Sequence, residues 1–405
     1  MEVAGTLRVY HLGYLARVMV VILFASVIVH GAGIFQVFLP GAGYFALIGL
    51  CLTLAAGFVL CLLNQTPVTA ISAAAIVAFL IFQNLVFAYN AQVPPNINAV
   101  ISYLPLVSFV LIRQRILLPQ VMLRTLAVLA CGYLLIYVLM HNYLVEVGRE
   151  KNPALLPQDE LRGARVRLLL EQASFVMFYA TTGRNMAVWK RAAMFLLGLS
   201  ALWISGSRTY MAVFALVYVL AMFRMLGVAA RSALFAIFMA ISLIFLSGIF
   251  LPWNPLNIVS ADNSGLARAM EYTYAIDALR HHWLLGVGLW SDFDSFQSFL
   301  KTPLYNPLYP SDLGIIGPYM VFGLFGMIAY VVATYICIVP RFPQLHTPAM
   351  RALRLNCVVC GAYGIISPAI VLESSAFFLA LLIGCVLRVR RSHNLDIRGG
   401  HLSLR

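Results

Sequence analysis

The sequence predicts an all-α, polytopic integral membrane protein, and three observations lead to this prediction. Hydrophobic residues make up 62% of the 405 residues, charged residues only 10%, and the mean hydropathy is +0.92. A soluble domain is about 45–50% apolar and about 25% charged. The apolar residues also gather in runs of about 20, the length at which a helix crosses the hydrocarbon core of a bilayer. We therefore expect one helical domain over residues 1–405.

The apolar runs predict about twelve spans, so both termini are expected on the same side of the membrane. The first run is longer than the apolar core of a signal peptide and has no small-residue cleavage site, so we expect it to stay in the membrane. The expected spans are residues 17–38, 43–63, 68–89, 96–112, 121–141, 166–183, 192–206, 208–226, 232–251, 312–338, 356–372 and 374–389.

The charge distribution predicts the orientation. The side that holds both termini carries 18 of the 27 Lys and Arg residues but only two of the fourteen acids, Glu2 and Asp396. Positively charged loops face the cytoplasm, so we place both termini there. The net charge of +13 is then a topology signal that suits anionic membrane lipids, and nucleic acid is not expected as a partner.

One long polar stretch, residues 252–311, separates the ninth and tenth expected spans. A large loop of this kind is where a membrane protein usually carries out chemistry or recognition. Within it, Ser264 is placed as the N-cap of a helix that ends near His282. Arg268 and Glu271 are spaced for an i,i+3 pair on that helix.

Two other features of this loop favour ordinary structural interpretations. Asp277 and Arg280 are also three residues apart, and we interpret them as a solvated surface pair of little energetic value. The Gly286–Gly288 turn that follows is a weak signal for phosphate binding, and we expect it to serve packing.

Arg208 ends the turn Ser205-Gly-Ser-Arg208 between two short apolar runs. A run of about 15 residues covers only about 22 Å of helix, which places Arg208 below the outer membrane surface. A charge at that depth normally faces a bundle interior or a wet cavity, and a guanidinium suits a phosphate. The alternative is an arginine that snorkels from a helix end.

Asp312 stands at the start of the tenth expected span, after Pro310 and Ser311. Two interpretations are open: an N-cap stabilised by the helix dipole, and a general base at the mouth of a cavity. The small residues that follow, at positions 314, 317, 323 and 326, predict close helix packing.

Three further features carry weaker signals. Arg162, Arg165 and Arg167 approach the sixth span from the outer side, where they suit either a polyanionic substrate or snorkelling. His282 is either an acid–base residue or, next to Trp283, an interfacial residue. Cys357-Val-Val-Cys360 lies in an apolar run with no second pair, so we expect small core residues and no metal site.

The order of these motifs resembles the O-antigen ligase/polymerase superfamily. The resemblance lies within residues 190–340 and rests on Gly206-Ser-Arg208, Arg268, His282-Trp-Leu-Leu-Gly-Val-Gly288, Leu313-Gly-Ile-Ile-Gly317 and Gly323-Leu-Phe-Gly326. It implies a GT-C-like helical fold in the bacterial inner membrane, with the active site facing the periplasm. It also implies glycan transfer from an undecaprenyl-pyrophosphate carrier, without metal, cofactor or nucleotide sugar.

The resemblance also implies roles for individual residues. Arg208 and Arg268 match the paired arginines that bind the pyrophosphate, and Arg165 is a third candidate. Ligases of the family typically have a His-Asn pair where this chain has Ser311-Asp312, and this departure favours a polymerase. Asp312 is then the first candidate for the catalytic base, with His282 and Glu271 in reserve.

The expected function is thus polymerisation of carrier-linked oligosaccharide repeat units into O-antigen or exopolysaccharide. The expected partners are the carrier-linked oligosaccharide, the growing polysaccharide, membrane lipids and a chain-length regulator. One alternative is a ligase that transfers glycan to lipid A core or another acceptor. A second is a lipid-linked oligosaccharide flippase; transporters of this kind tend to show internal repeats and midplane charges, neither of which this sequence has. A structural partner of an export complex is the third.

Overall fold

The computed structural model describes residues 2–32, 34–35, 41–64, 66–113, 118–151, 168–183, 186–251, 253–259, 263–290, 310–340, 342, 347–368, 371 and 376–400. Every regular element in these ranges is helical, which confirms the predicted all-α class. The α-helices are α1 (Glu2–Ala32), α3 (Ala42–Leu63), α4 (Pro67–Ala91), α5 (Ile97–Tyr103), α6 (Phe109–Ile112), α7 (Pro119–Lys151), α8 (Leu170–Thr182), α9 (Val188–Ile204), α10 (Arg208–Met222), α11 (Val228–Ser247), α12 (Asn263–His282), α14 (Ile316–Ile338), α15 (Pro348–Tyr363) and α16 (Phe377–Gly400). The 3₁₀ turns are η1 (Leu104–Ser108), η2 (Pro255–Val259) and η3 (Pro310–Asp312).

Each expected span overlaps at least one of these helices. Six helical segments in the described ranges are long and apolar enough to cross a membrane: Tyr14–Ala32, Ala42–Leu63, Pro67–Ala91, Pro119–Glu146, Val228–Ser247 and Ile316–Ile338. The chain is therefore a helical protein with several membrane-crossing candidates. The helices at the other expected spans are shorter, interrupted or partly charged, so the total of twelve stays a prediction.

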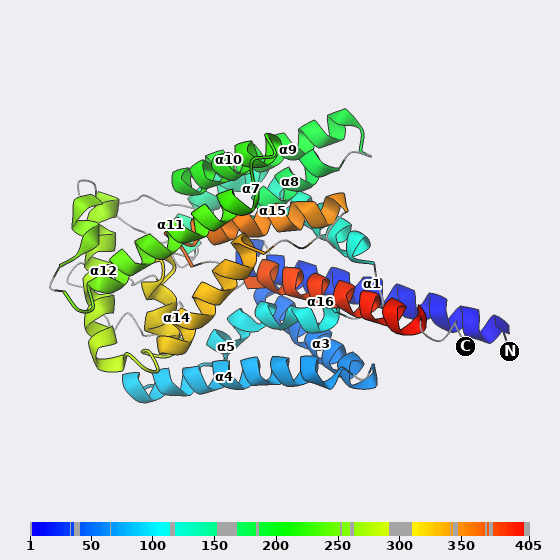
Figure 1. Cartoon of the computed structure of the whole chain (residues 1–405), viewed down its shortest axis with the longest axis horizontal. Coiled ribbons are helices and arrows are strands. Elements are labelled where there is room, and N and C mark those ends of the chain that lie inside the picture. Colours follow the sequence, from blue (N-terminus) through cyan, green and yellow to red (C-terminus); the bar gives the residue numbers. More distant parts are fainter. Residues whose placement is uncertain are drawn as a thin grey trace.

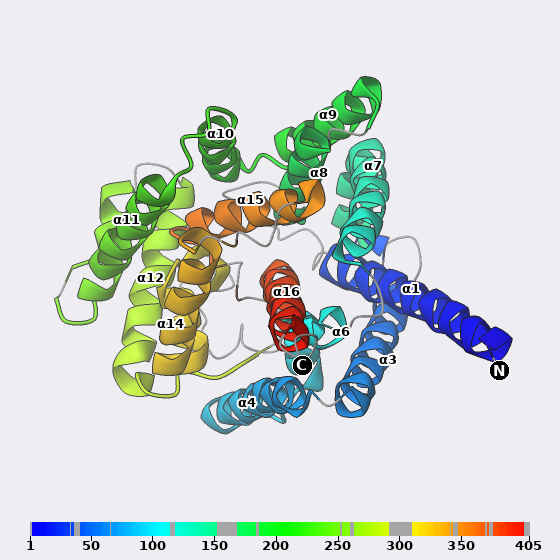
Figure 2. The same cartoon turned by 45° about the vertical axis from the view of Figure 1, so that its right-hand side comes forward.

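The helices form a bundle with α12 lying across one end (Figure 1). α1 begins and α16 ends at the opposite end of the bundle, so both chain ends lie on one side. Turned by 45°, the bundle shows α16 near its middle, with α1, α3, α4, α14 and α15 around it (Figure 2). The first turns of α16 are accordingly buried, from Phe377 to Leu382.

Basic residues hold the helix ends on the side away from α12. Arg354, at the start of α15, donates to the carbonyls of the last turn of α14 and, at 2.7 Å, to Pro340. Arg231 of α11 donates to the same Pro340 oxygen at 3.1 Å. Arg191 of α9 donates to Ala180 of α8 at 2.9 Å. The last carbonyls of a helix have no partners within it, so these arginines satisfy them.

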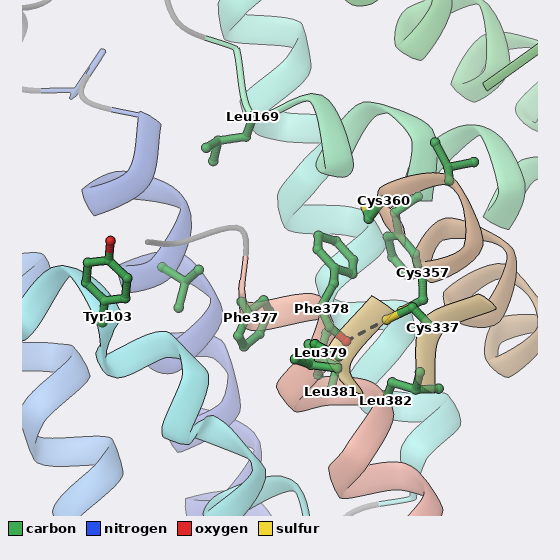
Figure 3. Close-up of a cluster of buried hydrophobic side chains, with 14 of the residues drawn as sticks. Tyr103, Leu169, Cys337, Cys357, Cys360, Phe377, Phe378, Leu379, Leu381 and Leu382 are labelled. Carbon is green, nitrogen blue, oxygen red and sulfur yellow. Dashed lines mark hydrogen bonds between the residues drawn. The ribbon is translucent and has the colours of Figure 1, made fainter. Parts of the chain in front are cut away.

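The cysteines of α14 and α15 belong to the apolar core (Figure 3). Cys337, Cys357 and Cys360 are buried and carry free thiols, and Sγ of Cys357 lies 3.6 Å from the carbonyl oxygen of Phe378. Phe377 and Phe378 of α16 fill the space beside them. The prediction that Cys357 and Cys360 are small core residues is confirmed.

The segment that follows α12 is extended, and it joins α12 to two other helices. The N–H of Val287 donates to Met320 of α14 at 2.7 Å, and that of Leu289 donates to Gln83 of α4 at 2.9 Å. The side chain of Asn84, also in α4, donates to the Leu289 carbonyl at 2.9 Å. Backbone groups in an apolar bundle must find partners within the protein, and here the partners are other backbone groups and an amide.

Three glycines permit this close approach. Gly286 and Gly288 have φ values of 74° and 105°, and a Cβ on Gly288 would overlap the backbone of Phe87. Gly323 (φ 63°, ψ −155°) interrupts α14 at the contact, where the N–H of Leu324 bonds to Leu284. The packing interpretation of the Gly286–Gly288 turn is confirmed, as is the close packing expected around position 323.

Gly288→Ala should destabilise the protein. The φ of 105° disfavours a side chain and the added Cβ meets backbone that cannot move away, at a cost of about 2 kcal/mol or more. The measurement is the melting temperature in detergent. The matched control is Gly132→Ala on α7, where a Cβ would meet nothing within 4 Å. Equal melting temperatures for the two variants would contradict this account of the turn.

Candidate functional site

The candidate site is an ion pair at the end of the bundle covered by α12. Nε of Arg268 lies 3.9 Å from Oδ2 of Asp312, and their side chains are 34% and 25% exposed. Arg268 belongs to α12 and Asp312 to η3, just before α14. The pair therefore joins the polar loop to the start of a membrane-crossing candidate, and both side chains remain accessible to a ligand.

Asp312 does not cap α14. The N-cap residue of that helix is Ile315, whose side chain makes no capping hydrogen bond. The intervening turn contains Gly314 (φ 54°), whose N–H bonds at 3.0 Å to the carbonyl of Ile366 beyond α15. This turn sets Asp312 apart from the helix axis, so the N-cap interpretation is wrong.

The direction of the Arg268 side chain follows from the amphipathic pattern of α12. Buried residues recur along one face of this helix: Ala269, Glu271, Tyr272, Ala275, Ile276 and Leu279. The Tyr272 hydroxyl donates to the Phe245 carbonyl of α11, and burial raises the pKa of Tyr272 to about 12. Glu271 is 5% exposed, so the second reserve base lies inside the same face.

Three other residues of α12 lie away from the pair. Asp277 and Arg280 are exposed, in agreement with a solvated surface position. His282 ends the helix, and its carbonyl accepts a bond of 2.7 Å from Gly286. At 1.5 Å per residue His282 lies about 21 Å along the axis from Arg268. His282 therefore does not share a site with the pair.

Tyr363 at the end of α15 lies beside the pair and was missed by sequence reasoning. The turn after Tyr363 meets the turn after Asp312: the Ile366 N–H donates to the Tyr363 carbonyl at 2.9 Å, and the Ile366 carbonyl accepts from Gly314 at 3.0 Å. The hydroxyl is thus within electrostatic reach of Asp312 and Arg268. Its ring packs edge-on against that of Tyr210 in α10, with the ring centroids 4.9 Å apart and the planes at 76°. An aromatic residue at the end of an apolar run is too common to have marked it.

Arg208 is at the same end of the bundle, because it precedes Tyr210 by two residues in the first turn of α10. The short apolar runs on either side predicted a turn before Arg208, and this turn contains Gly206 at φ 66°. The Arg208 side chain is exposed and makes no hydrogen bond or ion pair within the described ranges. Two residues turn a helix by about 200°, so Arg208 leaves α10 on a face away from Tyr210.

Tyr210 is anchored in a buried polar cluster. Its hydroxyl lies 2.7 Å from Oγ of Ser174 in α8, which donates at 2.5 Å to Oδ1 of Asn356 in α15. Glu171 of α8 is 6% exposed and acts electrostatically on Tyr210. Sequence reasoning gave this cluster no role, since its members are far apart in the chain.

Several candidates lie outside the described residues. They are Arg162, Arg165 and Arg167, which precede α8. Among the residues that are described, no group of three or more His, Cys, Asp or Glu side chains could hold a metal ion.

No family model, curated protein or solved structure matches this chain.

The geometry defines what the pair can do chemically. Within the described ranges Nε of Arg268 has no hydrogen-bond partner, because 3.9 Å is an ion-pair distance and too long for a hydrogen bond. Nε is itself buried, so the donors that the 34% exposed side chain can offer to an anionic ligand are those of its terminal Nη groups, next to the Asp312 carboxylate.

Arg268→Ala should leave the stability of the protein nearly unchanged. A half-exposed pair at this distance contributes about 0–1 kcal/mol. The measurement is the melting temperature in detergent, with Leu279→Ala on the same helix for comparison. Leu279 is fully buried, and its truncation should cost about 2–5 kcal/mol. A loss for Arg268→Ala as large as for Leu279→Ala would show that the arginine is a structural element.

Proposed function

We propose that this chain is a glycosyltransferase that polymerises undecaprenyl-pyrophosphate-linked repeat units at the periplasmic face of the bacterial inner membrane. The observation that supports it is the Arg268–Asp312 pair, an anion-binding group beside a base, at the end of the bundle opposite the chain termini. The termini lie in the cytoplasm under this proposal, since the arginines of the other end follow the positive-inside rule.

The proposed reaction is direct displacement at an anomeric carbon. A hydroxyl oxygen of the acceptor sugar attacks that carbon, and the bond to the carrier diphosphate breaks with its electron pair going to the diphosphate. The hydroxyl proton passes to the Asp312 carboxylate. Arg268 stabilises the negative charge that develops on the leaving group, which is the larger contribution in a water-poor site.

Arg208 has the second anion-binding role in this proposal. It lies in the first turn of α10, at the same end of the bundle as the pair, and is exposed. A polyprenyl diphosphate carries its charge over two phosphate groups, so one guanidinium for each group is a reasonable match. Because Arg208 leaves α10 on a face away from Tyr210, this second role comes from the resemblance of the sequence and not from a contact with the pair.

Arg268→Ala and Arg208→Ala should each abolish long-chain glycan while the protein is still inserted in the membrane. Removal of one charged donor from the leaving group costs about 10²–10³ in rate. The measurement is the polymer pattern on a gel from a deletion strain that carries each variant, together with the carrier-linked lipid that accumulates. Arg280→Ala, an exposed arginine on the same helix, is the control and should be active.

The accumulated lipid separates the alternatives. A single carrier-linked repeat unit indicates a polymerase, and full-length carrier-linked polymer indicates a ligase. A repeat unit that is never exposed outside the membrane indicates a flippase. Normal polymer from Arg268→Ala would refute the proposed role of the pair.

Asp312→Asn should reduce turnover more than Asp312→His, because an amide cannot take a proton and an imidazole can. The measurement is the rate of polymer formation by purified protein in nanodiscs with a carrier-linked donor. Equal rates for the wild type and both variants would exclude Asp312 as the base.

A further inference from the structure

Tyr363 lies near the ion pair, since the turn that follows it bonds to Gly314 just after Asp312, and its ring packs on Tyr210. The role inferred for these two tyrosines rests on the proposed function. Tyr363 is the described side chain on which Asp312 and Arg268 both act, yet neither composition nor motif singles it out. A phenol donates one hydrogen bond and has no charge at neutral pH. Beside an arginine it therefore provides a second, neutral donor to a phosphate oxygen.

The helix alone does not fix the direction of the Tyr363 side chain. It is the last residue of α15, where backbone hydrogen bonding ends and side-chain direction depends on tertiary contacts. The ring contact with Tyr210, at 4.9 Å and 76°, is the edge-to-face arrangement that aromatic rings prefer. Tyr210 is 2% exposed, so it supports the Tyr363 ring from inside the bundle.

Tyr210 is held in turn by side chains from two more helices. Ser174 and Asn356 are completely buried, and their bonds of 2.7 and 2.5 Å connect α8, α10 and α15. The Nδ2 group of Asn356 has no hydrogen-bond partner in the described part of the chain. A buried donor left unsatisfied costs about 1–3 kcal/mol, so an apolar packing of the same volume would be more stable. The cluster therefore provides a defined geometry at the expense of stability.

α10 depends on this cluster for its placement. Its buried residues are only Tyr210, Phe214 and Val217, and it follows a turn that contains a left-handed glycine. Of these three, Tyr210 alone bonds to a polar partner and touches Tyr363. Loss of its ring would free both the start of α10 and the end of α15.

We propose that Tyr363 donates a hydrogen bond to the carrier diphosphate and that Tyr210 is a positioning residue that holds the Tyr363 ring beside Arg268 and Asp312. Ser174 and Asn356 fix the Tyr210 hydroxyl and hence the direction of its ring.

The test uses purified full-length protein in nanodiscs with a carrier-linked repeat unit as donor. Tyr363→Phe keeps the ring and removes the donor, and should lower kcat by about 10–100-fold with little change in KM or melting temperature. Tyr210→Leu should lower kcat as much. In the double variant no further loss is expected, because both changes remove the same interaction.

Two variants separate positioning from general stability. Tyr210→Phe keeps the ring but loses the bond to Ser174, and should lower kcat by about 3–10-fold, the effect of one neutral hydrogen bond. Tyr218→Leu also removes a ring from α10, one that packs on Phe178 and Phe214 away from the pair. It should lower the melting temperature as Tyr210→Leu does, with kcat unchanged.

The outcomes distinguish this inference from the proposed function. Two results would overturn the role of the tyrosines while Arg268→Ala remains inactive. One is full activity of Tyr363→Phe, and the other is an equal loss of kcat in Tyr218→Leu and Tyr210→Leu. Full activity of Arg268→Ala would overturn the proposed function first. A binding assay with undecaprenyl diphosphate alone adds a reading that does not require turnover, because the free diphosphate carries in full the charge that develops on the leaving group. Weaker binding by Tyr363→Phe supports the hydrogen bond even though KM for the donor is unchanged, and unchanged binding contradicts it.

Discussion

An interrupted helix in an apolar bundle must find hydrogen-bond partners for the backbone groups that the interruption frees. In this chain Gly323 breaks α14, and the extended segment from Leu284 to Leu289 supplies and receives the missing bonds. That segment is the direct continuation of α12, so satisfying α14 also fixes the helix that carries Arg268. The same residues bond to α4 through Gln83 and Asn84. The candidate site thus depends on backbone bonding at a place where no catalytic side chain lies.

Other contacts position the Arg268–Asp312 ion pair, and the pair itself contributes little to the stability of the fold. At 3.9 Å, with both side chains partly exposed, the attraction between Arg268 and Asp312 is too weak to set the position of α12. The apolar face of α12 and the Tyr272 hydroxyl do that. Charges that are held by other contacts keep their capacity to interact with a ligand, which is the arrangement an enzyme needs to stabilise a transition state.

The sequence predicted what depends on local pattern. Apolar runs and the helical spacing of one polar stretch were enough for the helical class, for α12 and for the turn before Arg208. The predicted cap was wrong, because α12 begins at Asn263 and includes Ser264. It could not predict what depends on contacts between distant segments: the partner of Arg268, the position of Tyr363, and the cluster that joins Ser174 to Asn356 across 182 residues. The N-cap alternative for Asp312 arose because Pro-Ser-Asp before an apolar run is a good local capping pattern. The Gly314 bond to Ile366, which moves the helix start to a later residue, has no local signal.

The arginines at the far end of α14 have a mechanical consequence. Arg354 donates to the carbonyls of its last turn and to Pro340, and Arg231 also donates to Pro340. At the interruption, the residues next to Gly323 bond to the segment after α12. A helix that is held at its last turn and again at Gly323, its eighth residue, cannot shift along its axis without breaking several hydrogen bonds together. The Asp312 carboxylate just before α14 therefore keeps a constant position relative to α12, and under the proposed function the lipid-linked chain passes a base that does not move.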